Sequence, residues 1–224
     1  MPAAPRTPAD PLDDPALRSL MSESLLALAR KGELRRYRRG TLLIEEGDVG
    51  DTLYLIASGR LRAFSAHPSN GREFTFGVYG RGEYVGEMGL DGDRRSASVI
   101  TMEPSQCVVI GRATLMRHLH DDPPFAFELL AKVIRRARAA TMSARQMALN
   151  DVYGRLRALL ETLAESPPDG PPVVRELPTQ QELAQRLGCT REMVTRLFAD
   201  LRAGGYVELR KPDLLLLRAL PPRW

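Results

Sequence analysis

The sequence predicts an α+β fold in which an N-terminal antiparallel β-roll is joined by one long helix to a C-terminal helix-turn-helix with a β-hairpin wing. Three observations lead to this prediction. Short β-branched and aromatic runs separated by glycines fill the span from Leu34 to Ile110. A stretch of 29 residues without Gly or Pro follows Pro124, and two short capped helices lie in the last third of the chain. A doubly wound parallel sheet is disfavoured, because no crossover helix fits between the runs.

The N-terminal segment divides into an arm and a helix. Five prolines in the first 15 residues prevent a helix from propagating, so residues 1–15 are expected to form a mobile, disordered arm. From Ala16 to Arg30, leucines recur at helical spacing and predict a short amphipathic helix.

Six short apolar runs after this helix predict the strands of the roll. Glycines in the gaps between the runs provide turns, which is typical of an antiparallel roll or barrel. With its flanking helices, this domain is expected to span residues 16–124. The runs are Thr41–Ile44, Leu53–Ala57, Leu61–Phe64, Phe74–Tyr79, Ala97–Thr101 and Cys107–Ile110.

The helix predicted over residues 125–150 is longer than either domain needs for its own core. One set of its positions steps by four and three residues, the a/d spacing of a coiled-coil seam, and predicts a homodimer. A helix packed on its own domain through Met142, Met147 and Leu149 is the alternative. The seam positions are Leu130, Ile134, Ala137, Thr141, Ala144 and Ala148.

Residues 151–224 predict a winged helix-turn-helix, beginning where Asp151 restarts a helix as an N-cap. Thr179 and Glu182 have the spacing of a capping box, which starts one helix. Gly188 permits a sharp turn, and Thr190 caps the next helix. The apolar runs after Gly205 predict the wing.

The exposed face of the second of these helices has the chemistry of major-groove reading. Arginine can bind guanine O6 and N7 together, and glutamate can accept from cytosine N4. The alternative is a solvated face with an ion pair between Glu192 and Arg196. Residues 151–224 carry 11 basic and 10 acidic side chains, a net charge of only +1. Affinity for double-stranded DNA must therefore come from the local placement of basic side chains and from dimerisation. The predicted DNA-binding residues are Thr179, Gln180, Thr190, Arg191, Glu192, Thr195 and Arg196.

The run Gly188-Cys-Thr-Arg-Glu-Met-Val-Thr-Arg196 resembles the recognition helix of the CRP/FNR family of transcription regulators, with the arginine typical of its catabolite-activator branch at Arg191. The resemblance implies that Arg191, Glu192 and Arg196 read a TGTGA-like half-site. It also implies a cyclic-nucleotide-binding β-roll, a homodimer, and RNA polymerase as a partner.

A second segment resembles the phosphate-binding cassette of that family. It consists of Gly86-Glu-Met-Gly-Leu90 followed by Arg94-Arg-Ser-Ala97. An arginine at position 95 can neutralise a cyclic phosphate, a serine can donate to it, and a glutamate can accept from a ribose hydroxyl. The resemblance implies cAMP or cGMP as the effector. The predicted ligand-binding residues are Gly86, Glu87, Met88, Arg95, Ser96, Arg136 and Thr141.

Two departures from the family pattern keep the effector open. The loop from Glu87 to Arg95 is shorter than in the catabolite-activator branch, and Ala140 stands where that branch places a hydroxyl against the base. Another small-molecule effector, or DNA binding without a ligand, is therefore the alternative.

Other classes of function find little support. The two cysteines, Cys107 and Cys189, build neither a disulfide framework nor a thiolate metal site, and His118 with His120 lacks further ligands, so no metal is expected. No catalytic constellation is present, which disfavours a cyclic-nucleotide-acting enzyme. A haem-based sensor is disfavoured because His67 lies outside the cassette. Without an apolar run of membrane length or a signal pattern, the expected location is the cytoplasm.

Overall fold

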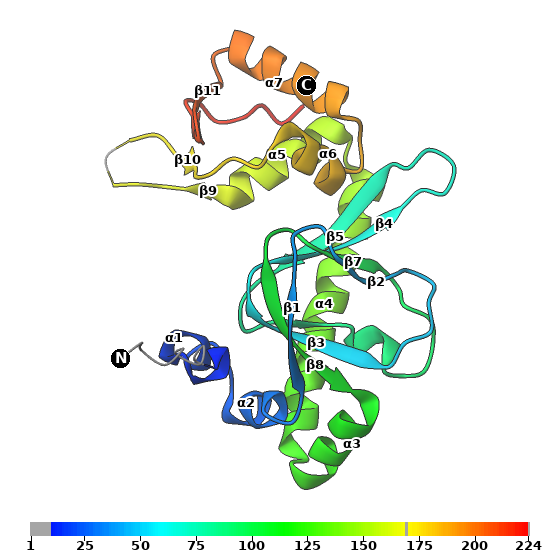
Figure 1. The fold of residues 1–224 in the computed structure, drawn as a ribbon. Coiled ribbons are helices and arrows are strands. Elements are labelled where there is room, and N and C mark those ends of the chain that lie inside the picture. The colour runs from blue at the N-terminus through cyan, green and yellow to red at the C-terminus, as the bar shows by residue number, and fades with distance from the viewer. Residues whose placement is uncertain (1–9, 169, 224) are drawn as a thin grey trace, which may run out of the picture. The chain divides into compact units, whose positions relative to one another are not determined.

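The computed structural model describes residues 10–168 and 170–223 (Figure 1). Within them the chain forms two compact units. The N-terminal unit contains residues 10–65 and 75–135, and the C-terminal unit contains residues 66–74 and 136–223. No helix of the described residues is long and apolar enough to cross a membrane.

The N-terminal unit begins with a 3-10 helix and two short α-helices, η1 (Pro11–Asp13), α1 (Pro15–Arg18) and α2 (Glu23–Ala29). Residues 1–9 of the expected arm lie outside the described residues. From residue 10 the structure differs from that expectation, because residues 11–13 form η1 and Leu12 is buried. The physical reason is that a proline at the first helical position needs no N–H partner, and an aspartate N-cap precedes each of the two prolines. The single helix expected over residues 16–30 is split at Ser22, which caps α2.

Eight strands build the roll as two antiparallel sheets, in the orders β1-β8-β3-β6 and β2-β7-β4-β5. Figure 1 shows β1, β8 and β3 side by side. The expected antiparallel roll is therefore confirmed. The strands are β1 (Glu33–Tyr37), β2 (Leu42–Ile44), β3 (Thr52–Ser58), β4 (Leu61–Ala66), β5 (Glu73–Tyr79), β6 (Tyr84–Val85), β7 (Ser98–Thr101) and β8 (Ser105–Gly111).

Alternate side chains of β3 enter two different cores, because successive residues of a strand point to opposite faces. Ile56 faces the second sheet and packs with Leu61 of β4 in that sheet and with Cys107 of the neighbouring strand β8. Leu53 and Leu55 face the helices instead, and the same cluster contains α1, α2 and the first turn of the long helix. β3 is thus apolar on both faces, which explains its nearly continuous hydrophobic run.

The helices α3 (Arg112–Asp121) and α4 (Pro124–Leu149) follow the roll. At 1.5 Å per residue, the 26 residues of α4 extend about 39 Å. Phe125 is buried, whereas Phe127, Leu130 and Ile134 are 76%, 52% and 41% exposed. These three side chains repeat at intervals of three and four residues and form an apolar stripe along α4. The side chain of Ala148, an expected seam position, lies outside those that the structure describes.

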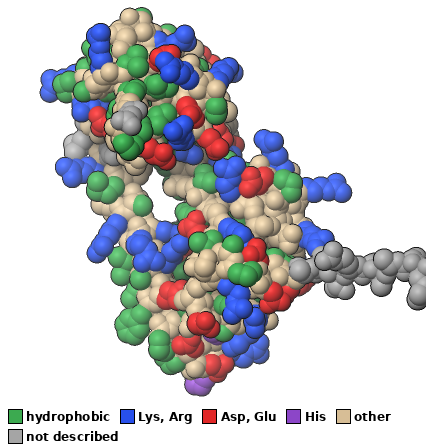
Figure 2. Space-filling model, turned by 90° about the vertical axis from the view of Figure 1, so that its left-hand side faces the viewer, with side chains coloured by type: hydrophobic (Ala, Val, Ile, Leu, Met, Phe, Trp, Pro, Cys, Tyr) green, Lys and Arg blue, Asp and Glu red, His purple; other side chains and the backbone are tan. Residues whose placement is uncertain are grey.

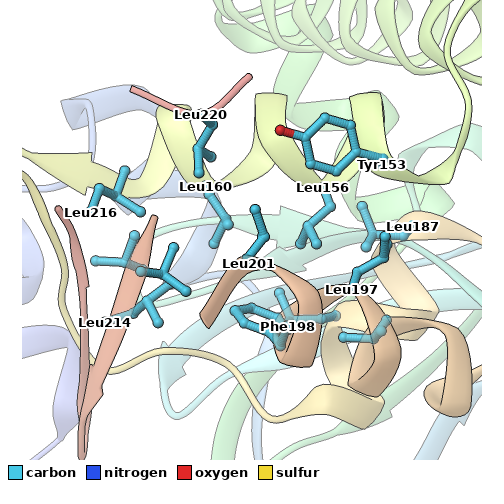
Figure 3. Close-up of a cluster of buried hydrophobic side chains, with 14 of the residues drawn as sticks. Tyr153, Leu156, Leu160, Leu187, Leu197, Phe198, Leu201, Leu214, Leu216 and Leu220 are labelled. Atoms are coloured by element: carbon cyan, nitrogen blue, oxygen red, sulfur yellow. The ribbon is translucent and has the colours of Figure 1, made fainter. Parts of the chain in front are cut away.

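The C-terminal unit packs three helices against a four-stranded antiparallel sheet of order β11-β12-β10-β9. Its core consists mainly of leucines from α5, α7 and β12, with Tyr153 and Phe198 (Figure 3). The wing is the β11–β12 hairpin, in which Arg210 pairs with Asp213. The elements are α5 (Val152–Leu163), β9 (Ala164–Glu165), β10 (Val173–Val174), α6 (Gln180–Leu187), α7 (Arg191–Ala203), β11 (Val207–Arg210) and β12 (Asp213–Leu216).

Leu160 is a direct test of this core, because it is fully buried in the C-terminal unit. We expect Leu160→Ala to lower the free energy of unfolding of the unit by about 2–5 kcal/mol, through lost burial and the cavity left behind. Urea unfolding followed by circular dichroism measures the change. Leu209→Ala, at a leucine that is 39% exposed, is the control and should cost less than about 1 kcal/mol. Equal losses in the two variants would contradict the assignment of this core.

Candidate functional site

The predicted cassette is a turn that follows β6 in the N-terminal unit. Gly86 has φ of 96° and precedes the 3-10 helix η2 (Glu87–Gly89). A Cβ at Gly86 would lie 2.6 Å from the carbonyl oxygen of Thr52. The backbone conformation and this close approach both require glycine.

Arg95 is the central side chain of the cassette and is only 6% exposed. Its Nη1 donates to the carbonyl of Gly86 at 2.8 Å, and its Nη2 donates to the carbonyl and the hydroxyl of Thr52, both at 3.0 Å. A Cβ on Gly50 would come within 2.6 Å of Nε, so this glycine also makes room for the guanidinium. These bonds use three of the five N–H donors of the Arg95 side chain. Within the described residues they are its hydrogen bonds to the chain, so two N–H donors are left for an anion.

The other predicted residues of the cassette surround Arg95. Glu87 is 8% exposed, whereas Met88 is 56% exposed. The exposed Ser96 directs its hydroxyl to Sδ of Met88 at 3.6 Å, a weak contact that an incoming acceptor can replace. The structure thus brings Gly86, Glu87, Met88, Arg95 and Ser96 together, with the donors and the acceptor that a cyclic phosphate and a sugar hydroxyl require.

Sequence reasoning missed Thr52 and Gly50, the two residues that hold and accommodate Arg95. Thr52 begins β3 and lies 43 residues before its partner, so no local pattern joins the two. The only available signal was the position of Gly50 just before a predicted strand.

The two ligand-binding residues predicted on the long helix belong to the other unit of the chain. Arg136 and Thr141 lie in the part of α4 that belongs to the C-terminal unit. Thr141 is exposed and donates to the carbonyl of Ala137 at 3.0 Å. Their contact with an effector stays a prediction.

The predicted capping box is confirmed at the start of the helix-turn-helix. The Thr179 hydroxyl accepts from the N–H of Glu182 at 3.2 Å, and the Glu182 carboxylate accepts from the N–H of Thr179 at 2.8 Å. Gly188 ends α6 with φ of 65°, and Thr190 caps α7 by accepting from the N–H of Met193 at 3.3 Å. The local signals read from the sequence therefore produce the turn as expected.

The predicted reading face lies on the solvent side of α7. Val194, Leu197, Phe198 and Leu201 are buried, while Arg191, Glu192, Thr195 and Arg196 are exposed. Gln180, at the start of α6, accepts from the Thr195 hydroxyl at 2.6 Å, which ties the two helices together on this face.

Glu192 and Arg196 do not form an ion pair among the described residues, so the alternative of a self-paired face finds no support. Hydrogen bonds from its own N–H and from the Thr190 side chain lower the pKa of Glu192, which keeps the carboxylate ionised as an acceptor. Figure 2 shows basic and acidic side chains interspersed over the visible surface, in keeping with a net charge of only +4.

The histidines and cysteines do not gather as metal ligands: no group of three His, Cys, Asp or Glu side chains is suitable in the described part of the chain. His118 is buried on α3, with Nδ1 3.3 Å from Nζ of Lys31 and its ring edge-on to Phe125. Burial raises the pKa of the Cys107 thiol to about 12. Both side chains therefore belong to the interior of the N-terminal unit.

Comparisons with known proteins match both domains of the chain. Residues 34–122 match the cyclic nucleotide-binding domain, and residues 154–220 match the Crp-like helix-turn-helix domain. The CRP-like cAMP-activated global transcriptional regulator of Mycobacterium tuberculosis is 29% identical over 197 residues, which cover 86% of this chain and 88% of that protein. The CRP-like protein Clp of Xanthomonas euvesicatoria is 31% identical over 191 residues, with coverage of 81% and 83%.

Solved structures lead to the same family. The c-di-GMP responsive global regulator CLP of Xanthomonas campestris has a TM-score of 0.74 and 27% identity to this chain, and the match covers 86% of this chain and 97% of that one. The catabolite activator protein of Thermus thermophilus has a TM-score of 0.53 and 29% identity, with coverage of 94% and 95%. These relatives are named as regulators and not as enzymes. The chain therefore belongs to the CRP/FNR family of ligand-responsive, DNA-binding transcription regulators.

Proposed function

We propose that the chain is a homodimeric regulator that binds a cyclic nucleotide, cAMP or cGMP, in the cassette and then reads a TGTGA-like palindrome. The observation that carries this proposal is the buried Arg95 beside Ser96, with two N–H donors left for a phosphate. A buried arginine in a glycine-lined turn suits a compact anion, because its planar fork is fixed before the anion arrives.

A second effector, c-di-GMP, would fit the phosphate contacts of the cassette equally well. One relative is named as cAMP-activated, and the related structure is described as c-di-GMP responsive. Both ligands carry a phosphodiester within a ring, so Arg95 and Ser96 serve either. The contact with the nucleotide base would distinguish the two ligands. Ala140, at the position expected to face the base, offers no hydroxyl for that contact. An unrelated small molecule, or DNA binding without ligand, remains the alternative.

The apolar stripe on α4 supports the homodimer. Phe127, Leu130 and Ile134 are exposed in the single chain and follow seam spacing. A second copy of the same helix fits this stripe, since a coiled-coil seam is self-complementary. The proposed role in transcription implies RNA polymerase as a partner and a cytoplasmic location.

The test of this function measures binding of a labelled duplex with two TGTGA half-sites by fluorescence anisotropy while cAMP, cGMP or c-di-GMP is titrated. We expect one of the three to raise DNA affinity in the wild-type chain. No response to any of them would reject the cyclic-nucleotide effector.

Variants of the cassette sharpen the test. Arg95→Lys keeps the charge but loses the fork, and Ser96→Ala removes one donor at an exposed site. We expect each to weaken nucleotide binding, measured by calorimetry, by about 1.5–3 kcal/mol, since the lost hydrogen bonds end on a charged group. Ser19→Ala, an exposed serine at the end of α1, is the control. Unchanged affinity in both cassette variants would show that the nucleotide binds elsewhere.

A further inference from the structure

The first half of α4 is bonded to the chain segment that leads into the cassette. Nζ of Lys132 donates to Oε1 of Glu83 at 2.9 Å and lies 5.6 Å from the ring centroid of Tyr84. Lysine side chains are mostly exposed in proteins, yet that of Lys132 is only 21% exposed. The cation is thus held between a carboxylate and the face of an aromatic ring, both beside the start of β6.

Glu83 is itself held in the roll. Its other carboxylate oxygen, Oε2, accepts from the N–H of Gly80 at 2.9 Å, and its carbonyl accepts from the N–H of Ile56 in β3 at 2.8 Å. Tyr84, the next residue, is 3% exposed and lies in β6, which pairs with β3. Lys132 therefore bonds to a residue that is fixed by the sheet.

The other end of the segment Gly86–Leu90 is bonded to α3. Nε of Arg112, the first residue of α3, donates at 3.0 Å to the carbonyl of Leu90, the residue that ends η2. The N–H of Arg112 donates to the carbonyl of Asp51 at 2.8 Å, immediately before the residue of β3 that holds Arg95. Arg112 thus joins the end of η2 to the start of β3.

Lys132 lies on the side of α4 opposite the apolar stripe. Successive residues of a helix are about 100° apart, so Lys132 is about 160° from both Leu130 and Ile134. These two side chains are 52% and 41% exposed, whereas Lys132 is turned towards the roll. The bond to Glu83 is therefore compatible with a second copy of the chain on the stripe.

We propose that Lys132 and Arg112 are positioning residues, which join the segment Gly86–Leu90 to α3 and to the first half of α4 as one rigid element. Neither of them touches the effector, since they act through Glu83 and Leu90. A site that is ordered before its ligand arrives loses less conformational entropy on binding, so both bonds raise effector affinity. This gain in affinity rests on the proposed function, whereas the rigidity of the element does not.

Hydrogen exchange without nucleotide tests the rigid element in the full-length chain. Lys132→Met removes the charge and keeps an apolar stem, so we expect the amides of residues 83–90 to exchange about threefold to thirtyfold faster than in the wild type. Lys31→Met is the matched control, because it removes the ion pair with Asp121, 3.5 Å long, between the end of α2 and α3. It should leave exchange of residues 83–90 unchanged. Equal exchange in Lys132→Met and the wild type overturns the proposal.

Nucleotide affinity separates a positioning role from a merely structural one. Calorimetric titration with cAMP, cGMP and c-di-GMP identifies the nucleotide that binds the wild type. For that nucleotide we expect Kd to rise about threefold to thirtyfold in Lys132→Met and to stay near the wild-type value in Lys132→Arg. The exchanged pair Glu83→Lys/Lys132→Glu should recover part of the loss. Faster hydrogen exchange with an unchanged Kd would overturn the positioning role.

Sedimentation velocity excludes an indirect effect through assembly. Because Lys132 lies opposite the stripe, all of its variants should have the assembly state of the wild type. A weaker Kd that appears only together with a changed assembly state would contradict the proposal.

Arg112→Ala tests the second bond. Loss of the hydrogen bond to the Leu90 carbonyl should raise Kd about twofold to tenfold. Arg117→Ala, at an exposed arginine of the same helix, is the control and should bind like the wild type. An unchanged Kd in Arg112→Ala would overturn the part assigned to Arg112.

The two proposals fail separately. If no nucleotide binds the wild type while Lys132→Met still exchanges faster, the rigid element stands and the assigned effector is wrong. If a nucleotide binds the wild type and Lys132→Met with equal affinity, the effector stands and Lys132 is not a positioning residue.

Discussion

Replacing Arg191 with alanine is expected to weaken binding to the TGTGA palindrome by about 2–6 kcal/mol, a loss of roughly thirtyfold to twenty-thousandfold. The reason is that one bidentate arginine–guanine contact contributes about 1–3 kcal/mol, and a dimer makes it in both half-sites. Arg191 is exposed at the first turn of α7, where this contact is geometrically available. Fluorescence anisotropy with specific and scrambled duplexes measures the loss.

Arg202→Ala is the matched control, since Arg202 is an exposed arginine in the last turn of the same helix. It should leave specific binding nearly unchanged. The salt dependence distinguishes base from phosphate contacts, because each lost phosphate contact lowers the slope of log K against log salt by about 0.9. A lower slope in Arg191→Ala, with discrimination between duplexes intact, would contradict base reading by Arg191.

If α4 forms the proposed coiled-coil seam, Ile134→Glu is expected to convert the homodimer to a monomer. Ile134 is 41% exposed in the single chain, so the charge costs the fold of one protomer little, whereas at a seam it would bury two facing carboxylates. Loss of the second half-site should weaken operator binding by a factor of about 100 to 10,000, the gain that linkage of two sites provides. Sedimentation velocity measures the assembly state.

The control for the seam is Ala139→Glu, which adds the same charge at an exposed position of α4 that is out of step with the stripe. It should remain a dimer. If both variants stay dimeric, the apolar stripe is not the dimer contact, and the expected coiled-coil seam would have to be abandoned.

Features with a local cause were predictable from the sequence. The start of α6 follows from Thr179 and Glu182, and its end follows from Gly188, because caps and left-handed turns depend on neighbouring residues. The same holds for the long helix, whose expected span of residues 125–150 differs by one residue from α4 at each end. The buried and exposed faces of α7 follow from helical periodicity.

Features that depend on distant contacts were not predictable. The surroundings of Arg95 depend on Thr52, which reaches it only once β3 is placed in the sheet. The prediction of a disordered N-terminal arm was wrong because its prolines prevent a long helix but suit the first position of two short helices. Burial of Leu12 and Leu17 then stabilises these two helices. Arg136 and Thr141 stay predictions for a related reason, since their role depends on how the two protomers meet.

Arg95 is held against Thr52 and Gly86 by three hydrogen bonds that the chain itself provides. A receptor whose anion-binding group is immobilised beforehand loses little conformational entropy when its ligand arrives. A phosphate pocket built on such a fixed group is then a poor sensor by itself, because little of it is free to rearrange. The difference in ligand affinity between the inactive and active states must therefore arise elsewhere in the molecule, where the ligand contacts side chains that are free to rearrange.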